Sequence, residues 1–437
     1  MSSPLFDPVF GSSAASAALS DASWIRALLD VEVALAHSCA DVGLVPALDA
    51  AEIDRAAQQL AMSLDPAALG HEAAAGGNPV IALVEKLRSA ADVPPRSVHL
   101  GATSQDIMDS ALMLLMRRAG DVVLGDARRC VDAAEGLARR HRDTPMVART
   151  LGQQAVPTTF GAVAAGWAVS VHDASIALSG TLDAAPVQLG GAAGTLASLH
   201  PHGPAVSADL ARRLGLRASH GPWHTDRVPL ARIATAFGVL AGAVSGPALT
   251  IVLLSATEVG EVSENSPGGS SAMPHKRNPV AAITARAAAS RVPGSVATIL
   301  SAMSHDHQRA SGAWHAEWLT TTDIVRGTGG AAARLADCLT GLRVHTDVMR
   351  RNLDITGGAI LAERVTAALA DHTDDARVIV TSACVDGRPL DEDPAVLEHL
   401  SADTVRTLTD PEQYTGHAAD IVDSALDHIT STRGVTS

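Results

Sequence analysis

Residues 237–256 read F-G-V-L-A-G-A-V-S-G-P-A-L-T-I-V-L-L-S-A and contain no charged side chain. A second uncharged run covers residues 151–171. Each run reaches the roughly 20 residues that a helix needs to span a bilayer. Both runs nevertheless contain Gly, Ser, Thr or Gln throughout, and they lack the basic flanking loops that orient membrane helices. We therefore predict helices buried on all sides in a soluble bundle, without membrane contact.

The composition of the 437-residue chain also favours helices. The chain is rich in alanine and only 2 % aromatic, a usage that suits close-packed helices better than β-sheets. Strand-type alternation is nearly absent, so the predicted fold class is all-α. Helical patterns are expected at residues 20–45, 49–60, 79–90, 106–142, 157–182, 205–215, 226–264, 279–303 and 316–341.

Turn residues and composition divide the chain into three predicted helical domains. Pro94 and Pro95 mark the first boundary, and shorter, more acidic segments follow residue 346. The long central helices are too apolar to be shielded by one chain, so we expect them to meet copies from other subunits. The expected domains are an N-terminal domain at 1–95, a central long-helix bundle at 96–345 and a small C-terminal domain at 346–437.

Charge and cysteine content argue against several classes of protein. The chain has 47 acidic against 33 basic residues and a formal net charge of -14, which disfavours a nucleic-acid partner held by electrostatics. The N-terminal residues lack a basic region followed by an apolar run, so we predict no signal peptide and a cytoplasmic location. Because no C-x-x-C pair occurs, we expect buried thiols rather than a zinc site or disulfides at Cys39, Cys130, Cys338 and Cys384.

Three polar clusters interrupt the helical pattern. They are G-A-T-S-Q-D at 101–106, A-R-T-L-G-Q-Q-A-V-P-T-T-F-G at 148–161 and G-G-S-S-A-M-P-H-K-R-N-P-V at 268–280. Each is expected at the beginning of a long helix, where backbone N–H groups attract anions, so all three could converge on one polyanionic substrate. Taken singly, the first cluster also fits a plain helix cap, the second buried polar side chains that satisfy helix backbones, and the third a surface linker.

Taken together, the clusters resemble the fumarase/aspartase superfamily. The stretch G-S-S-A-M-P-H-K-R-N-P is highly specific to it, and the three motifs follow the order of the family over nearly the whole chain. The resemblance implies an all-α fold of three domains, a homotetramer built about a shared helix bundle, active sites shared between subunits, and no metal or organic cofactor. Within the superfamily, the chain is most similar to the 3-carboxy-cis,cis-muconate cycloisomerases of aromatic degradation in T-T-F-G, Q-L-G-G-A-A-G-T-L (188–196), P-W-H-T-D-R (222–227) and G-A-W-H-A-E-W (312–318).

The resemblance also assigns roles to residues. Ser270 would be the catalytic base on a loop that closes over the substrate, with Lys276 as the nearby cation that stabilises the serine alkoxide. Lys276 and Asn278 would hold the substrate carboxylate that accepts electron density. The small-molecule polycarboxylate would be bound by Thr103, Ser104, Gln105, Arg149, Thr150, Gln153, His224, Arg227, Ser271, Met273 and Asn278.

The implied reaction removes a proton α to a carboxylate, delocalises the carbanion into that carboxylate and expels a β substituent. Lactone formation by a cycloisomerase is the same chemistry in reverse. Many superfamily lyases have histidine after the R-T of the second cluster, whereas Leu151 follows Thr150 here and cannot donate a proton. A lyase of the adenylosuccinate or argininosuccinate type is therefore less favoured than a cycloisomerase.

Two alternatives stay open. The segment 363–389 is shorter and more acidic than expected of a cycloisomerase, which suits a divergent lyase that releases fumarate from a 2-substituted succinate. Nitrosuccinate fits such a lyase, because nitrite is a good leaving group that needs little protonation. The other alternative is a catalytically silent structural homologue that keeps the fold for packing alone.

Several histidines outside the clusters need separate interpretations. His224 is the better candidate for substrate contact, whereas His71 fits a surface or packing role. Asn78 lies where related lyases place a second histidine. His315 and Glu317 flank Trp314 and Trp318, and they are equally compatible with an inter-helix polar pair.

Overall fold

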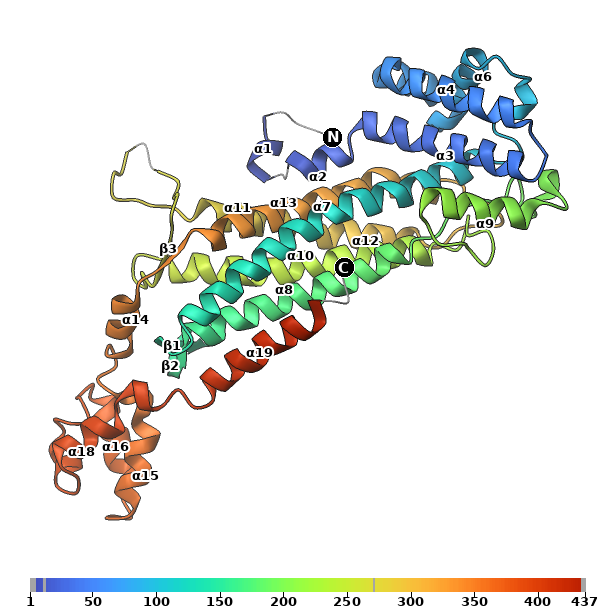
Figure 1. Cartoon of the computed structure of the whole chain (residues 1–437). Helices are drawn as coiled ribbons and strands as arrows, with labels where there is room; N and C mark the ends of the chain where they lie inside the picture. The colour runs from blue at the N-terminus through green and yellow to red at the C-terminus, as the bar shows by residue number, and fades with distance from the viewer. Residues whose placement is uncertain (1–4, 11–12, 270–271, 434–437) are drawn as a thin grey trace. The chain divides into compact units, whose positions relative to one another are not determined.

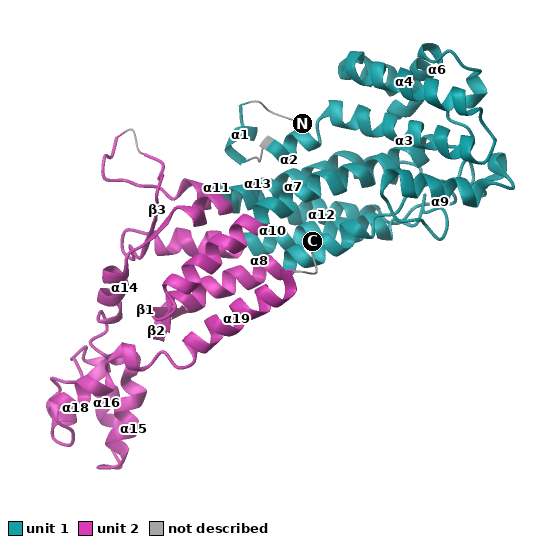
Figure 2. Ribbon diagram, viewed as in Figure 1, with its two compact units in different colours: residues 1–127, 174–245, 284–334 teal, residues 128–173, 246–283, 335–437 magenta. Residues whose placement is uncertain are grey.

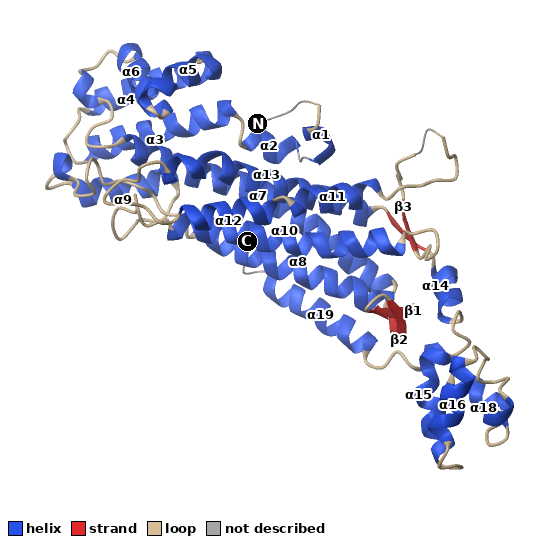
Figure 3. Ribbon diagram, turned by 180° about the vertical axis from the view of Figure 1, so that it is seen from behind, coloured by secondary structure: helices blue, strands red, loops and turns tan. Residues whose placement is uncertain are grey.

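The structure is a computed structural model that describes residues 5–10, 13–269 and 272–433. The described chain is mostly helical, and its strands are short (Figures 1 and 3). The predicted predominance of helices is confirmed, although four short strands accompany them in the described residues.

The chain folds into two compact units (Figure 2). Unit 1 comprises residues 1–127, 174–245 and 284–334, and unit 2 comprises residues 128–173, 246–283 and 335–437. Each unit takes three separate stretches of chain, because the long helices continue from one unit into the other. The division into domains at 1–95, 96–345 and 346–437 uses other boundaries and stays a prediction.

Unit 1 consists of helices whose starts follow from local sequence. Helix α3 begins after Ser20, whose Oγ accepts the backbone N–H of Ser23 at 3.2 Å and so caps the helix. The helices of this unit, four of which extend into unit 2, are α1 (Asp7–Phe10), α2 (Ser13–Ala18), α3 (Asp21–Asp41), α4 (Ala47–Ser63), α5 (Pro66–Gly76), α6 (Pro79–Ala90), η1 (Pro95–Ser97), α7 (Ser104–Arg140), η2 (Ala197–Leu199), α9 (Gly203–Leu214), α10 (Val228–Leu254), α11 (Val280–Ser290), α12 (Val292–Ala302) and α13 (Ala313–Thr340).

Unit 2 combines the other ends of the long helices with two antiparallel strand pairs. Strands β1 (Pro145–Thr150) and β2 (Gln153–Thr159) form a hairpin, and β3 (Val262–Glu264) pairs with β4 (Leu342–Val344). Its other elements are α8 (Phe160–Asp183), which ends in unit 1, α14 (Thr346–Leu353), η3 (Ala359–Leu361), α15 (Ala362–Ala370), α16 (Ala376–Val385), α17 (Pro394–Leu397), α18 (Ala402–Leu408), η4 (Pro411–Gln413) and α19 (Ala418–Thr432).

The structure corrects the predicted start of the helix at 157–182. Residues 145–159 form the β1–β2 hairpin, and α8 begins at Phe160. Its turn is Leu151–Gly152, and both residues have positive φ, 52° and 81°. The second polar cluster therefore lies mainly on a hairpin and not at a helix start. Pro145, Gly152 and Pro157 within thirteen residues already disfavour a helix there.

Three other boundaries differ from the prediction. Helix α10 ends at Leu254, because the chain turns back at 255–260 and the N–H of Glu261 bonds the carbonyl of Leu254 at 2.9 Å. The predicted helix 279–303 is two helices, α11 and α12, with Pro293 in the first turn of the second. Helix α5 was not predicted, although Asp65 caps it and Pro66 opens it.

Among the described residues, two helices are long and apolar enough, by length and composition, to cross a membrane. They are α8 and α10, and the protein buries 50 % and 44 % of their most apolar windows. Core helices of soluble proteins meet the same test. Val239 and Leu253 of α10 are 59 % and 58 % exposed, so burial of this helix on all sides is not achieved within the single chain.

The cysteines lie mostly as predicted. Cys39, Cys130 and Cys338 are buried, whereas Cys384 is only partly buried. Desolvation by burial raises the pKa of Cys39 to about 12 and also raises the pKa of Cys338. These thiols therefore remain protonated and unreactive at neutral pH.

Candidate active site

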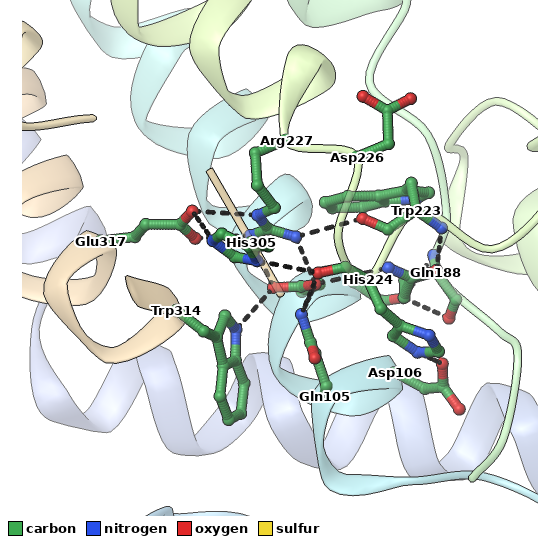
Figure 4. Close-up of polar contacts among 12 residues, drawn as sticks. Gln105, Asp106, Gln188, Trp223, His224, Asp226, Arg227, His305, Trp314 and Glu317 are labelled. Atoms are coloured by element: carbon green, nitrogen blue, oxygen red, sulfur yellow. Dashed lines mark hydrogen bonds and ion pairs between the residues drawn. The ribbon is translucent and has the colours of Figure 1, made fainter. Parts of the chain in front are cut away.

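A buried ionic cluster organises the polar residues of unit 1 (Figure 4). The side chain of Arg227 is 0 % exposed, and its guanidinium bonds two carboxylates. The distances to Asp109 are 2.8 Å from Nη1 and 3.2 Å from Nη2, and those to Glu317 are 3.0 Å from Nε and 2.6 Å from Nη2. Asp109 lies on α7 and Glu317 on α13, so Arg227 ties both helices to the segment that enters α10.

The two carboxylates keep the buried guanidinium of Arg227 charged. Desolvation alone would lower the pKa of Arg227, but Asp109 and Glu317 raise it above its usual value. Burial raises the pKa of Glu317, although Arg227 opposes that shift. Asp109 also accepts the indole N–H of Trp314 at 3.1 Å. His305 Nε2 lies 3.3 Å from Glu317 Oε1 without a hydrogen bond of good geometry.

Asp106 forms a second centre, at the start of α7. Its carboxylate accepts the backbone N–H groups of Thr103, Gly190 and Gly191, each at 2.9 Å. The bond to Thr103 is the reciprocal half of a capping box, so the capping role considered for T-S-Q-D is present. His224 Nε2 lies 2.7 Å from Asp106 Oδ1. One carboxylate therefore joins the first cluster, the Q-L-G-G loop and the P-W-H-T-D-R segment.

The two glycines of the Q-L-G-G loop are required by this close approach. A Cβ on Gly190 would lie 2.8 Å from His224 Cε1, and one on Gly191 would lie 2.8 Å from the carbonyl oxygen of Gly101. Gly191 also has a φ of 71°, which side chains disfavour. Glycine at both positions lets the loop reach the Asp106 carboxylate.

The side-chain amide of Gln105 forms its hydrogen bonds within the protein. It is 1 % exposed, and its Nε2 donates to Asp109 Oδ2 at 3.1 Å and to the carbonyl of His224 at 2.9 Å. Its Oε1 accepts Arg309 Nη1 at 3.1 Å. All three polar positions of the amide thus have internal partners. The adjacent Thr103 and Ser104 are half-buried, and no hydrogen bond of their hydroxyls to a described residue is found.

The second cluster lies on the hairpin of unit 2. The guanidinium of Arg149 makes a bidentate pair with Glu261, at 2.9 Å from Nη1 and 2.6 Å from Nη2. Glu261 is fully buried and also accepts Asn352 Nδ2 at 2.7 Å. Thr150 and Gln153 are exposed beside the turn, where Leu151 is fully exposed. Arg149 and Arg227 as carboxylate-binding residues stay predictions, and each already has carboxylate partners in its own chain.

The third cluster forms a loop closed at its base. Gly268 and Asn278 exchange two backbone hydrogen bonds of 2.9 Å, and a Cβ on Gly268 would lie 2.3 Å from Val280 Cγ2. Lys276 and Met273 are exposed on this loop. No ion pair of Lys276 with another described residue is found. Ser270 and Ser271, the predicted base and its neighbour, lie outside the described residues.

Glu264, on β3 before this loop, fixes the start of α11 after it. Its carboxylate accepts the backbone N–H groups of Ala281 at 3.2 Å and Ala282 at 2.8 Å. Glu264 is itself 4 % exposed. The loop is therefore attached to rigid structure at its C-terminal end.

The remaining sequence candidates have mainly structural contacts. Asn78 caps α6 by accepting the N–H of Val80 at 3.1 Å. His71 is exposed, as predicted, and its Nδ1 lies 2.8 Å from the carbonyl oxygen of Ala67. His315 and Glu317 do not pair with each other, because His315 contacts the carbonyl of Gly77 and Glu317 contacts Arg227.

Sequence reasoning named Glu317 as a candidate for an inter-helix polar pair but missed Asp109, Glu261 and Arg309. Asp109 precedes the uncharged stretch 110–116, and an isolated acid in an apolar run is a usable signal for a buried ion pair. The partner itself lies 118 residues away, so one sequence does not identify it. Arg309 lies in S-H-D-H-Q-R-A-S-G, which has no regular pattern.

Comparisons with known proteins agree over nearly the whole chain. A family model described as Lyase matches residues 7–294. The nitrosuccinate lyase of Streptomyces davaonensis is 42 % identical, covering 97 % of this chain and 94 % of that protein. The 3-carboxy-cis,cis-muconate cycloisomerase of Bradyrhizobium diazoefficiens is 41 % identical, covering 98 % of each chain. The crystal structure of 3-carboxy-cis,cis-muconate lactonizing enzyme from Pseudomonas putida superposes with a TM-score of 0.91 at 37 % identity, over 100 % of both chains.

Replacing Arg227 by methionine should strongly destabilise the protein. The change leaves Asp109 and Glu317 buried without their cation, which costs about 3–5 kcal/mol in comparable sites. Arg118→Met is the matched control, because Arg118 pairs with Asp30 at the surface, where such pairs contribute under about 1 kcal/mol. Urea unfolding measures both free energies. Equal losses in the two variants would contradict the structural role given to Arg227.

Proposed function

The chain belongs to the lyase family of the fumarase/aspartase superfamily, and we propose that it is a cofactor-independent lyase or cycloisomerase of a small polycarboxylate. The leading candidate is lactonisation of a substrate of the 3-carboxy-cis,cis-muconate type. Leu151, an exposed apolar residue at the turn of the second cluster, disfavours lyases that release an amine, and the similarity to several 3-carboxy-cis,cis-muconate cycloisomerases supports lactonisation. Leu151 offers no proton to a departing amine, and lactonisation has no departing group to protonate.

In the lactonising direction, a carboxylate oxygen of the substrate adds to the carbon β to a second carboxylate. Electron density moves into that second carboxylate, and the Ser270 hydroxyl then gives its proton to the α carbon. Solvent returns a proton to the serine alkoxide afterwards. In the reverse direction, the alkoxide removes the α proton and the carbon–oxygen bond breaks. Every step conserves atoms and charge without a cofactor.

The cation on the loop supports this chemistry. Serine is a poor base in water, and its alkoxide needs a nearby positive charge and a water-poor site. Lys276 lies six residues after Ser270 in a loop whose base is closed by the Gly268–Asn278 hydrogen bonds. We propose that Lys276 serves both the alkoxide and the carboxylate that becomes electron-rich, with Asn278 as a neutral donor beside it.

A second candidate is elimination of nitrite from nitrosuccinate with release of fumarate. It is favoured by the 42 % identity to a nitrosuccinate lyase. The elimination uses the same base and the same carbanion, and nitrite leaves without protonation, so Leu151 is compatible with it as well. An adenylosuccinate-type reaction fits less well, because its amine leaving group needs a proton donor.

An absorbance screen separates these candidates. Purified protein is assayed with 3-carboxy-cis,cis-muconate, nitrosuccinate, adenylosuccinate, argininosuccinate and aspartate. We expect loss of the diene absorbance with the first substrate. Fumarate appearing from nitrosuccinate alone would favour the second candidate. A folded protein that converts none of the five would support the catalytically silent homologue instead.

We also propose a soluble, cytoplasmic homotetramer that shares its active sites between subunits. The apolar side chains of α10 that remain exposed in the single chain support this assembly. Sedimentation at micromolar concentration should therefore give a tetramer. A monomeric species would contradict both the assembly and the shared sites.

Ser270→Ala should keep the fold and the assembly but lower kcat by at least about 10²-fold, the usual scale for a lost acid–base group. Lys276→Met should raise KM and lower kcat together, because one cation serves two groups. Ser271→Ala should have a milder effect. Arg277→Met, which removes the neighbouring charge from the same loop, is the control and should change turnover little. Steady-state kinetics measures the activity of each variant, and sedimentation checks its assembly. Near wild-type turnover in Ser270→Ala would show that Ser270 is not the base, and His224 would be the next candidate.

A further inference from the structure

Arg309 is presented by a short closed loop between α12 and α13 of unit 1. The carboxylate of Asp306 accepts the backbone N–H of Ser311 at 3.0 Å and its hydroxyl at 2.9 Å. These two bonds close residues 306–311 into a turn with Arg309 in it. His305, which precedes the turn, has a fully buried side chain beside Glu317. The turn is therefore attached to the ionic cluster of Arg227.

The guanidinium of Arg309 bonds only neutral acceptors. Nη1 donates to Gln105 Oε1 at 3.1 Å, and Nη2 donates to the carbonyls of Ala192 at 3.0 Å and Gly191 at 3.4 Å. Within the described residues, no carboxylate forms an ion pair with it. Arg227 and Arg149, by contrast, have carboxylate partners of their own chain. Arg309 thus retains an uncompensated positive charge although it is half-buried.

The contacts of Arg309 hold its side chain in a fixed orientation and leave donors for a ligand. A guanidinium has five N–H groups, and the three contacts use Nη1 and Nη2, so Nε–H and one Nη1–H remain. Three acceptors from two segments determine the direction of the planar group. The two remaining N–H groups lie on opposite edges of the planar group, so each can donate a single charge-assisted hydrogen bond to a carboxylate oxygen, in a direction that a flexible surface arginine does not fix.

The surroundings also point to an anionic ligand. Gly191 donates its N–H to Asp106, which also accepts the N–H of Thr103, while the carbonyl of Gly191 accepts Arg309. Arg309 is thereby attached to the segment that bears the Thr103 and Ser104 hydroxyls at the start of α7. Arg227 is paired with two carboxylates, whereas Arg309 has no ion pair with a described residue and keeps N–H donors for a ligand.

We propose that Arg309 binds a carboxylate of the substrate and is a specificity-determining residue for polycarboxylates, an inference that rests on the proposed function. A ligand carboxylate would accept one of the two remaining guanidinium N–H groups, with the Thr103 and Ser104 hydroxyls as neutral neighbours. A purely structural arginine at this position would only join Gln105 to the Gly191–Ala192 carbonyls. The two roles differ in whether ligand affinity depends on the charge.

The experiment measures binding without requiring turnover. Tricarballylate, an unreactive tricarboxylate, is titrated calorimetrically into wild-type protein, Arg309→Gln and Arg217→Gln. Arg217 is the matched control, because its exposed guanidinium also bonds a backbone carbonyl, that of Asp183 at 3.1 Å. Loss of a charge-assisted hydrogen bond should weaken binding to Arg309→Gln by about 10- to 100-fold. Arg217→Gln should bind like wild type, and Arg309→Lys, which keeps the charge, should recover part of the affinity.

The outcomes separate this inference from the proposed function. Equal affinity in Arg309→Gln and wild type overturns the inference, and so does a wild-type protein that binds no tricarballylate. Weaker binding in Arg309→Gln together with an equal loss in Arg309→Lys and a lowered melting temperature indicates a structural role and overturns it as well. Charge-dependent binding in a protein that converts none of the candidate substrates supports the inference while contradicting the proposed function.

Discussion

The buried guanidinium of Arg227 is the interaction on which the arrangement of unit 1 depends. It lies between Asp109 and Glu317 with all three side chains almost completely removed from solvent. A buried charge is tolerated only when its partners are close and well oriented. Helices α7 and α13 and the segment entering α10 must therefore keep their mutual positions. His224 and Gln105 are fixed as a consequence, since both bond groups within this network.

The sequence predicted elements whose cause is local. Helices α3, α4, α6, α9 and α13 were found within a few residues of their observed bounds, because capping side chains and apolar periodicity act over one or two turns. The hairpin of β1 and β2 was missed, since its turn uses Leu151 at positive φ, a conformation that sequence preferences disfavour. The early end of α10 was missed because the turn at 255–260, closed by the hydrogen bond from Glu261 to Leu254, has no Gly or Pro where the helix ends.

For the candidate site, too, the sequence predicted the local features and missed those that depend on packing. The motifs predicted which segments carry polar groups, and the structure places Thr103, Gln105, His224 and Arg227 in one network of unit 1. The internal partners of these groups were not predictable, because they come from chain positions roughly one hundred residues apart and depend on packing. The prediction that Arg227 contacts substrate came from its motif alone, and a motif does not reveal that two carboxylates already neutralise it.

The paired and unpaired cations therefore have different physical uses. Arg149 and Arg227 are held by buried carboxylates, so a substrate would have to compete with partners that are already desolvated. Lys276 and Arg309 lie on loops, and neither has an ion pair with a described residue. A ligand carboxylate binds more easily to a cation that is still partly hydrated, because no buried ion pair has to be broken when the ligand binds. The chain has a net charge of -14, which repels an anionic substrate overall. Such local positive groups attract the substrate at particular positions.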